Sequence, residues 1–196
     1  SLPRREMICG YGEILKHSLI LDRKFFLWLS KNANDIINKK DKKLLKLAVI
    51  KSCKIKSKVV NKDENEKDIR KILNFGHTFA HAFEATLKYS KKLNHGEAVL
   101  LGIISASKFS LKNNLLSLKE FKLIQNHLIR FKLPVKLKKN FSIKYLKNII
   151  SFMKIDKKNN NQKINLVLLK KIGKPVLNLN FENKSLYTFI KKELTN

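Results

Sequence analysis

The chain has 196 residues, a formal net charge of +28 and 43% hydrophobic residues. This length and composition suit one sizeable globular domain or two small ones and exclude wholesale disorder. No apolar run approaches the roughly 18 residues of a membrane span, and the first residues lack the pattern of a signal peptide, so we expect a cytoplasmic protein without a membrane partner. Arginine occurs only at positions 4, 5, 23, 70 and 130, and the lysines are scattered. Nucleic-acid-binding surfaces favour arginine and clustered charge, so we expect no nucleic-acid partner either.

Helical periodicity dominates the chain up to its last quarter. Helices are predicted over residues 13–21, 24–29, 41–61, 68–89, 96–112, 118–131 and 143–153. Two short strands are predicted within residues 163–179, on either side of Gly173-Lys174-Pro175, and a last helix covers residues 185–194. Three asparagines at 159–161 indicate a loop. The predicted fold is therefore mainly α, a helical bundle with a small β-hairpin near the C-terminus.

The predicted helix over residues 68–89 carries polar side chains that are unusual for a solvated face, which elsewhere in this chain consists of Lys and Glu. Four of them fall at i, i+4, i+7 and i+11, and so share one stripe of a helix: Arg70, Asn74, His77 and His81. Gly76 lies inside this stripe, where it costs about 1 kcal/mol of helix propensity. That cost indicates the close approach of a ligand or another backbone, or a break in the helix.

Three of the five histidines lie within residues 77–95, and together they suggest a metal site. Asn94 is a plausible N-cap with Glu97 completing a capping box, which places His95 in the first turn of the next helix. Catalytic zinc sites commonly have three protein ligands and one open position, and a carboxylate often accompanies two histidines. Glu13 can supply it, because an unpaired carboxylate among apolar neighbours would be costly.

The same residues also have simpler explanations. An HxxxH pair on a helix is often a coincidence, and a single glutamate more often forms a salt bridge. His17 and His127 have no such neighbours in sequence and are expected to be structural. Glu84 and Glu97 are expected to be capping or surface groups. From the residues alone, it stays open which histidines bind a metal.

Several blocks, in unbroken order, resemble the 3-dehydroquinate synthase family. The first two read G-x-[AG]-E-x-x-K at residues 10–16 and K-x-x-V-V-x-x-D-E-x-E at residues 56–66. The next two read R-x-x-L-N-x-G-H-T-x-x-H-A-x-E at residues 70–84 and H-G-E-A-V at residues 95–99. Asp156-Lys157-Lys158 and an I-G-K turn at 172–174 follow late in the chain. The combination is far more specific than an HxxxH pair.

The resemblance implies an activity and a role for each site residue. The family converts 3-deoxy-D-arabino-heptulosonate 7-phosphate into 3-dehydroquinate and phosphate in the shikimate pathway of aromatic amino acid biosynthesis, using Zn²⁺ or Co²⁺ and recycled NAD. It implies that the metal ligands are Glu13, His77 and His95. It implies that the catalytic and substrate-binding residues are Lys16 at the hydroxyls, Lys56 and Arg70 at the carboxylate, and Asn74, His81 and either Lys157 or Lys158 at the phosphate.

The resemblance also implies a domain arrangement. Family members carry an N-terminal α/β domain that binds NAD, whereas this chain has six glycines and no Gly-rich phosphate loop. We therefore expect residues 1–196 to be the C-terminal metal- and substrate-binding domain, without the NAD-binding domain and inactive alone. The full-length enzyme is expected to be a homodimer. Another NAD- and metal-dependent sugar-phosphate cyclase is the alternative, and a basic nucleic-acid-binding helical domain is the non-enzymatic one.

Overall fold

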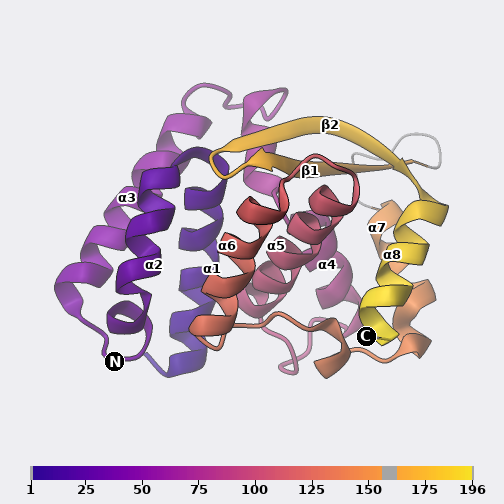
Figure 1. The fold of residues 1–196 in the computed structure, drawn as a ribbon, viewed down its shortest axis with the longest axis horizontal. Coiled ribbons are helices and arrows are strands. Elements are labelled where there is room, and N and C mark those ends of the chain that lie inside the picture. The colour runs from indigo at the N-terminus through magenta and orange to yellow at the C-terminus, as the bar shows by residue number, and fades with distance from the viewer. Residues whose placement is uncertain (1, 156–162, 196) are drawn as a thin grey trace.

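A computed structural model describes residues 2–155 and 163–195 and is mainly helical (Figure 1). Its α-helices are α1 (Arg4–Leu21), α2 (Arg23–Ile37), α3 (Lys42–Val60), α4 (His77–Thr86), α5 (His95–Lys112), α6 (Leu118–Arg130), α7 (Leu146–Ile155) and α8 (Asn183–Thr195). Short 3-10 helices are η1 (Ile69–Asn74), η2 (Leu137–Lys139) and η3 (Ile143–Tyr145). Strands β1 (Lys163–Lys171) and β2 (Lys174–Glu182) pair as an antiparallel hairpin. The predicted fold class is confirmed, whereas the loop predicted at residues 159–161 lies outside the described residues.

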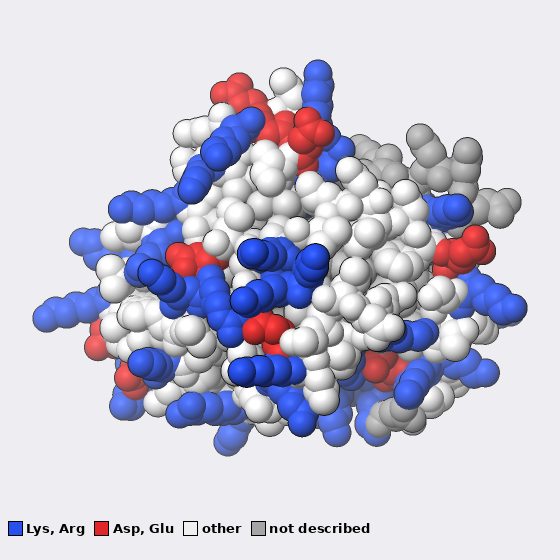
Figure 2. Space-filling view, turned by 45° about the horizontal axis from the view of Figure 1, so that its top comes forward, with Lys and Arg blue, Asp and Glu red and all other residues white. Residues whose placement is uncertain are grey.

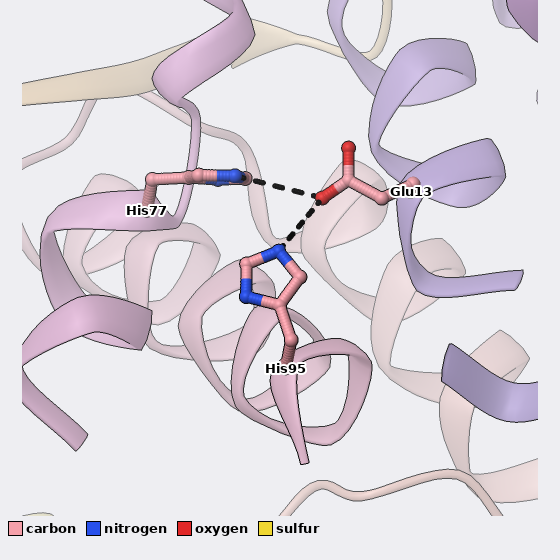
Figure 3. Close-up of side chains that lie close together, drawn as sticks. All are labelled: Glu13, His77 and His95. Carbon is pink, nitrogen blue, oxygen red and sulfur yellow. Dashed lines mark ion pairs between the residues drawn. The ribbon is translucent and has the colours of Figure 1, made fainter. Parts of the chain in front are cut away.

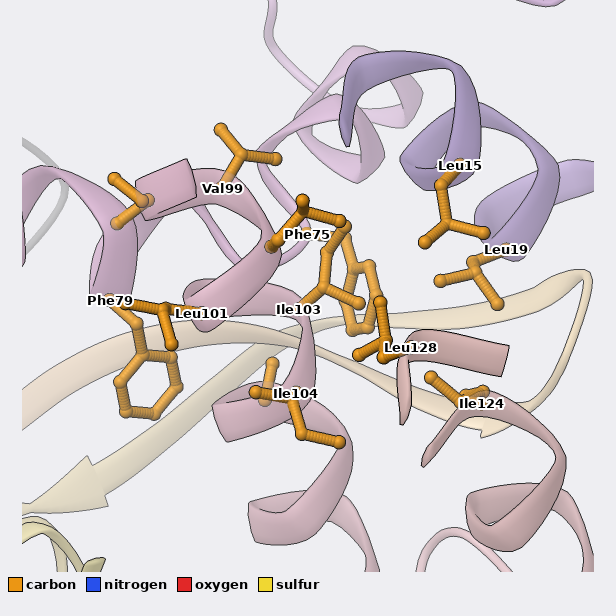
Figure 4. Close-up of a cluster of buried hydrophobic side chains, with 14 of the residues drawn as sticks. Leu15, Leu19, Phe75, Phe79, Val99, Leu101, Ile103, Ile104, Ile124 and Leu128 are labelled. Atoms are coloured by element: carbon orange, nitrogen blue, oxygen red, sulfur yellow. The ribbon is translucent and has the colours of Figure 1, made fainter. Parts of the chain in front are cut away.

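Helix α5 forms the centre of the bundle and contacts α1, α4, α6 and β1. Most of its side chains are buried, as expected of a helix that is apolar on nearly all sides. Figure 4 shows the cluster in which α5 meets its neighbours, and the labelled members are at most 2% exposed: Leu15, Leu19, Phe75, Phe79, Val99, Leu101, Ile103, Ile104, Ile124 and Leu128. Burial of this cluster is the main force that holds α1, α4 and α6 around α5.

Two glycines of α5 allow backbones to approach closely. A Cβ atom on Gly96 would lie 2.2 Å from the Cα atom of Cys9 on α1. A Cβ atom on Gly102 would lie 2.2 Å from the carbonyl oxygen of Gly76, which directly precedes α4. Carbon atoms in favourable contact are about 3.5–4.0 Å apart, so no side chain fits at either position. The backbone of α5 therefore contacts α1 at Gly96, in the first turn of α5. It contacts the residue that precedes α4 at Gly102, six residues further along α5.

The prediction of one helix over residues 68–89 is wrong, because the chain breaks at Gly76. Gly76 has φ +80°, a left-handed conformation that ends the 3-10 helix η1 and directs the chain into α4. Both signals inferred from this glycine, a helix break and a close backbone approach, are confirmed. Arg70 and Asn74 consequently lie on a different element from His77 and His81.

The remaining boundaries differ mainly in length from the predicted ones. Helix α1 begins at Arg4 rather than at residue 13, and α2 extends to Ile37 rather than residue 29. The hairpin is attached to the helices at its turn, where the Gly173 amide donates to the Leu19 carbonyl at 2.7 Å. The buried Glu120 carboxylate beside this turn accepts hydrogen bonds from the Ile172 amide and from Arg23. The hairpin is therefore held against the ends of α1 and α6.

Basic residues are distributed over the face shown in Figure 2, with acidic residues among them. This agrees with the scatter of lysines along the sequence. Among the described residues, no helix is both long enough and apolar enough to span a bilayer.

We expect Gly102→Ala to lower the free energy of unfolding by roughly 1–3 kcal/mol, because the added methyl group must displace backbone atoms around Gly76. Gly10→Ala is the matched control, since nothing lies within 4 Å of its added Cβ on α1. That change should raise stability by up to about 1 kcal/mol through helix propensity. Denaturant unfolding measures both variants, and equal stability of the two would contradict the close packing.

Candidate functional site

Three side chains from three helices converge at one point, as Figure 3 shows. Glu13 extends from α1, His77 is the first residue of α4, and His95 is the first residue of α5. The Nε2 atom of His77 lies 3.5 Å from Oε1 of Glu13, and the Nε2 atom of His95 lies 3.7 Å from the same oxygen. One ligand atom from each residue lies within 4.8 Å of the other two. We call these three residues the Glu-His-His group.

The start of each helix positions its member of the group. Helix α5 begins with a capping box, in which Asn94 Oδ1 accepts from the Glu97 amide at 2.9 Å and the Glu97 carboxylate accepts from the Asn94 amide at 3.0 Å. This predicted cap is confirmed, and it fixes where His95 leaves the backbone. His77 follows the left-handed Gly76 directly. Both histidines therefore occupy first turns of helices that the glycine contacts bring together.

The Glu13 carboxylate is ionised and has one oxygen available. Its Oε2 atom accepts from the ammonium group of Lys16 at 2.7 Å, whereas Oε1 is buried and has no hydrogen-bond partner among the described residues. Burial raises the pKa of Glu13, but His95 and Lys16 outweigh burial and hold that pKa far below its usual range. A buried anionic oxygen without a donor is costly unless a cation binds it.

The two histidines of the group differ in their protonation. Burial lowers the pKa of His77 to about 3, and the nearby Lys16 ammonium acts in the same direction, so this imidazole is neutral. The neighbouring carboxylates of Glu13 and Glu84 raise the pKa of His95 to about 10. A metal ion that binds His95 would therefore displace a proton from Nε2 and take its place beside Glu13.

The donor set fits a zinc or cobalt ion. Two imidazole nitrogens and one carboxylate oxygen form a common catalytic zinc set, which leaves a fourth position for water or substrate. Ligand atoms about 2.0–2.1 Å from zinc at tetrahedral angles lie roughly 3.3 Å apart, close to the two distances at Glu13. The unpartnered Oε1 atom would gain a cation. The chemistry and spacing of the group thus suit a metal ion, and the assignment of these three residues as ligands stays a prediction.

The group lines a polar cleft of about 380 Å³. Other residues at its wall are Lys16, His17, Lys56, Glu66, Arg70, Leu73 and Asn74. The structure therefore places four predicted substrate contacts, at positions 16, 56, 70 and 74, in the same cleft as the Glu-His-His group. Asn74 is oriented by Glu66, which accepts from its Nδ2 atom at 2.7 Å.

His81 lies beside this cleft rather than in it. Its ring centroid is 5.2 Å from that of His77, one turn earlier on α4. His81 lines a smaller hollow of about 50 Å³, which shares Asn74 and His77 with the cleft and is closed by hairpin residues including Asn178. The predicted contacts Lys157 and Lys158 lie outside the described residues.

Glu84 and Glu66 show where interpretation of the sequence fell short. Glu84 was expected to be a capping or surface group, but it is buried and accepts from Nδ1 of His95 at 3.1 Å. Its position two helical turns after His77, on the same side of α4, is the signal that could have revealed it. Glu66 was noted only as part of a motif, although it lines the cleft with a left-handed φ of 55°.

The remaining histidines and Glu97 follow the expectations more closely. His127 is structural as predicted, because it is buried and its Nε2 atom is 2.9 Å from the hydroxyl of Tyr11. His17 is held by Ser52 at 2.7 Å, but it also reaches the cleft wall. Glu97 caps α5 and pairs with Arg5.

Replacing His77 with Ala or Glu13 with Gln should abolish stoichiometric binding of Zn²⁺, because either change removes one of three ligands. The affinity for Zn²⁺ should fall by more than the roughly 10–100-fold that is typical when a residue hydrogen-bonded to a metal ligand is removed. Isothermal titration calorimetry with Zn²⁺ measures this. His127→Gln is the control, since it alters a buried histidine that does not belong to the group. Equal zinc affinity in the parent and the His77 variant would refute the ligand assignment.

Comparison with known sequences identifies relatives along the whole chain. A family model described as 3-dehydroquinate synthase C-terminal matches residues 10–159. The chain is 61% identical over 195 residues to a 3-dehydroquinate synthase from Pelagibacter ubique, covering 100% of this chain and 53% of that protein. It is 43% identical over 183 residues to one from Thermodesulfovibrio yellowstonii, covering 93% and 49%. The chain thus spans about half the length of the curated relatives it matches.

Solved structures show the same fold. The 2-epi-5-epi-valiolone synthase from Streptomyces hygroscopicus subsp. jinggangensis, with NAD⁺ and Zn²⁺ bound, superposes with a TM-score of 0.83 at 18% identity, covering 100% of this chain and 53% of that one. A 2-deoxy-scyllo-inosose synthase complexed with carbaglucose-6-phosphate, NAD⁺ and Co²⁺ gives a TM-score of 0.75 at 22% identity, covering 98% and 53%. These likenesses concern the fold. Because the family model matches most of its length, the chain belongs to the 3-dehydroquinate synthase family, in the C-terminal part.

Proposed function

We propose that the chain forms the metal- and substrate-binding part of a 3-dehydroquinate synthase. This enzyme would convert 3-deoxy-D-arabino-heptulosonate 7-phosphate into 3-dehydroquinate and phosphate in the shikimate pathway, as a phosphate-eliminating carbon–oxygen lyase. The observation that carries the proposal is the Glu-His-His group in the wall of a cleft that also presents Lys56 and Arg70. Family membership supports the same activity.

The Glu-His-His group would hold Zn²⁺ or Co²⁺, and NAD would be bound mainly by parts of the longer protein outside this chain. The solved relatives named above contain NAD⁺ together with one of these metals, which supports both expectations. A bound metal of this kind supplies Lewis acidity at a substrate hydroxyl during oxidation of its carbon. Lys16 lies against the group, with its ammonium 2.7 Å from Glu13 and 3.4 Å from His77, and it would hold the same hydroxyls.

The two hollows suit a substrate with an anion at each end. Arg70 and Lys56 both line the larger cleft, and a guanidinium and an ammonium group in one cleft suit a carboxylate. Asn74 faces both hollows, and His81 lines the smaller one. We infer that the carboxylate lies in the larger cleft and the phosphate beside Asn74 and His81, with Lys157 or Lys158 as a further phosphate contact. The substrate chain would then pass the Glu-His-His group.

Held in this way, the substrate needs little further help from the protein. Oxidation of the carbon near the phosphate-bearing end acidifies the adjacent proton, and phosphate leaves once that proton is removed. NAD bound by the longer protein would supply both this oxidation and a later reduction, and would therefore be recycled. The task of Lys16, Lys56, Arg70, Asn74 and His81 is to keep both anionic ends and the hydroxyls in one geometry while these steps follow each other.

Arg70→Ala in the full-length enzyme should lower kcat/KM for the heptulosonate phosphate by roughly 10–100-fold, because a charged hydrogen bond is worth about 1.5–3 kcal/mol. Phosphate release in the presence of NAD⁺ measures this. Arg130→Ala is the control, since Arg130 ends α6 outside both hollows. The contrary result has two parts: the parent enzyme releases phosphate only from sugar phosphates that lack a carboxylate, and Arg70→Ala has no effect. That result would indicate that the protein is another sugar-phosphate cyclase.

A further inference from the structure

The imidazole of His95 faces two carboxylates, one at each ring nitrogen. Figure 3 shows one nitrogen directed at Glu13 and the other directed away from it. The second nitrogen, Nδ1, lies 3.1 Å from Oε1 and 3.3 Å from Oε2 of Glu84. Glu84 is on α4, two helical turns after His77. Helix α4 therefore supplies His77 to the Glu-His-His group and also supplies the carboxylate that contacts Nδ1 of His95.

Glu84 is placed for this contact by burial. The residue is 8% exposed, whereas the side chain of His95 is 46% exposed and has room to rotate. A buried carboxylate requires a donor, and the imidazole N–H of His95 satisfies it. The contact therefore limits the rotation of a ring that the first turn of α5 alone leaves free.

The contact also determines which nitrogen is available to a metal. When Nδ1–H donates to Glu84, the neutral imidazole has its lone pair on Nε2, the atom that faces Glu13. Carboxylates that accept from a ligand histidine orient the ring and increase its basicity. Loss of Glu84 would leave the ring free to present either nitrogen in several orientations.

We propose that Glu84 is a positioning residue of the metal site, which holds His95 in the orientation and tautomer that bind metal through Nε2. The inference rests on the proposed function of the Glu-His-His group. Glu84 itself touches neither the metal position nor the cleft, since its carboxylate lies on the far side of the His95 ring.

The test compares Glu84→Ala and Glu84→Gln with Glu120→Gln. Glu120 is also buried and hydrogen-bonded, but it serves Arg23 and the hairpin turn. Chelator competition should show that Glu84→Ala raises the Zn²⁺ dissociation constant roughly 10–100-fold. Glu84→Gln should recover most of this loss, because the amide oxygen still accepts from Nδ1–H. Glu120→Gln should lower stability and leave the dissociation constant unchanged.

A second readout does not depend on affinity. In the zinc-loaded parent, ¹H–¹⁵N spectra of the imidazoles should show a protonated, slowly exchanging Nδ1 at His95, and this signal should be lost in Glu84→Ala. Parent-like zinc affinity and an unchanged Nδ1 signal in a folded Glu84→Ala variant would overturn the positioning role while leaving the metal site intact. Failure of the parent to bind Zn²⁺ at all would overturn the metal site, and the role of Glu84 with it.

Discussion

The close backbone contact of α5 with two neighbouring segments is the constraint on which the site depends. Gly96 allows α5 to approach α1 at Cys9, and Gly102 allows it to approach the chain at Gly76. Glu13, His77 and His95 each lie within one helical turn of one of these contacts. A larger side chain at either glycine would separate the helices and with them the ligand atoms. The geometry of the Glu-His-His group is therefore a consequence of core packing, and no loop has to close to assemble it.

The charged groups around these packed helices favour anions in the cleft and a cation at its wall. Lys16 occupies one oxygen of Glu13, so that the other remains available to a metal ion. His77 is neutral through burial, and Glu84 faces the outer nitrogen of His95. The net charge of +28 adds a positive field that favours the approach of anions in general. The lysine-rich composition thus suits the proposed substrate without requiring a nucleic acid.

Local sequence signals predicted the elements that local interactions determine. The Asn94 cap, the helix over residues 41–61 and the hairpin turn at Gly173 follow from capping and turn chemistry, and the structure agrees. The prediction of a single helix from Arg70 to His81 was wrong, because Gly76 adopts a left-handed φ and packs against the backbone of α5. Arg70, Asn74 and His77 still line one cleft, and His81 lines the smaller hollow beside it. Periodicity places Glu84 on the same side of α4 as His77, but its contact with His95 could not be predicted, because that partner lies on another helix.

The central claim is that packing of α1, α4 and α5 builds one metal site from Glu13, His77 and His95. Anomalous X-ray diffraction at the zinc absorption edge, from crystals of the zinc-loaded protein, tests it most directly. The account predicts a single strong peak about 2.0–2.1 Å from Nε2 of both histidines and from Oε1 of Glu13. A strong peak at another place in the molecule would contradict the claim. So would a peak whose position shows zinc bound by His81 in place of His95.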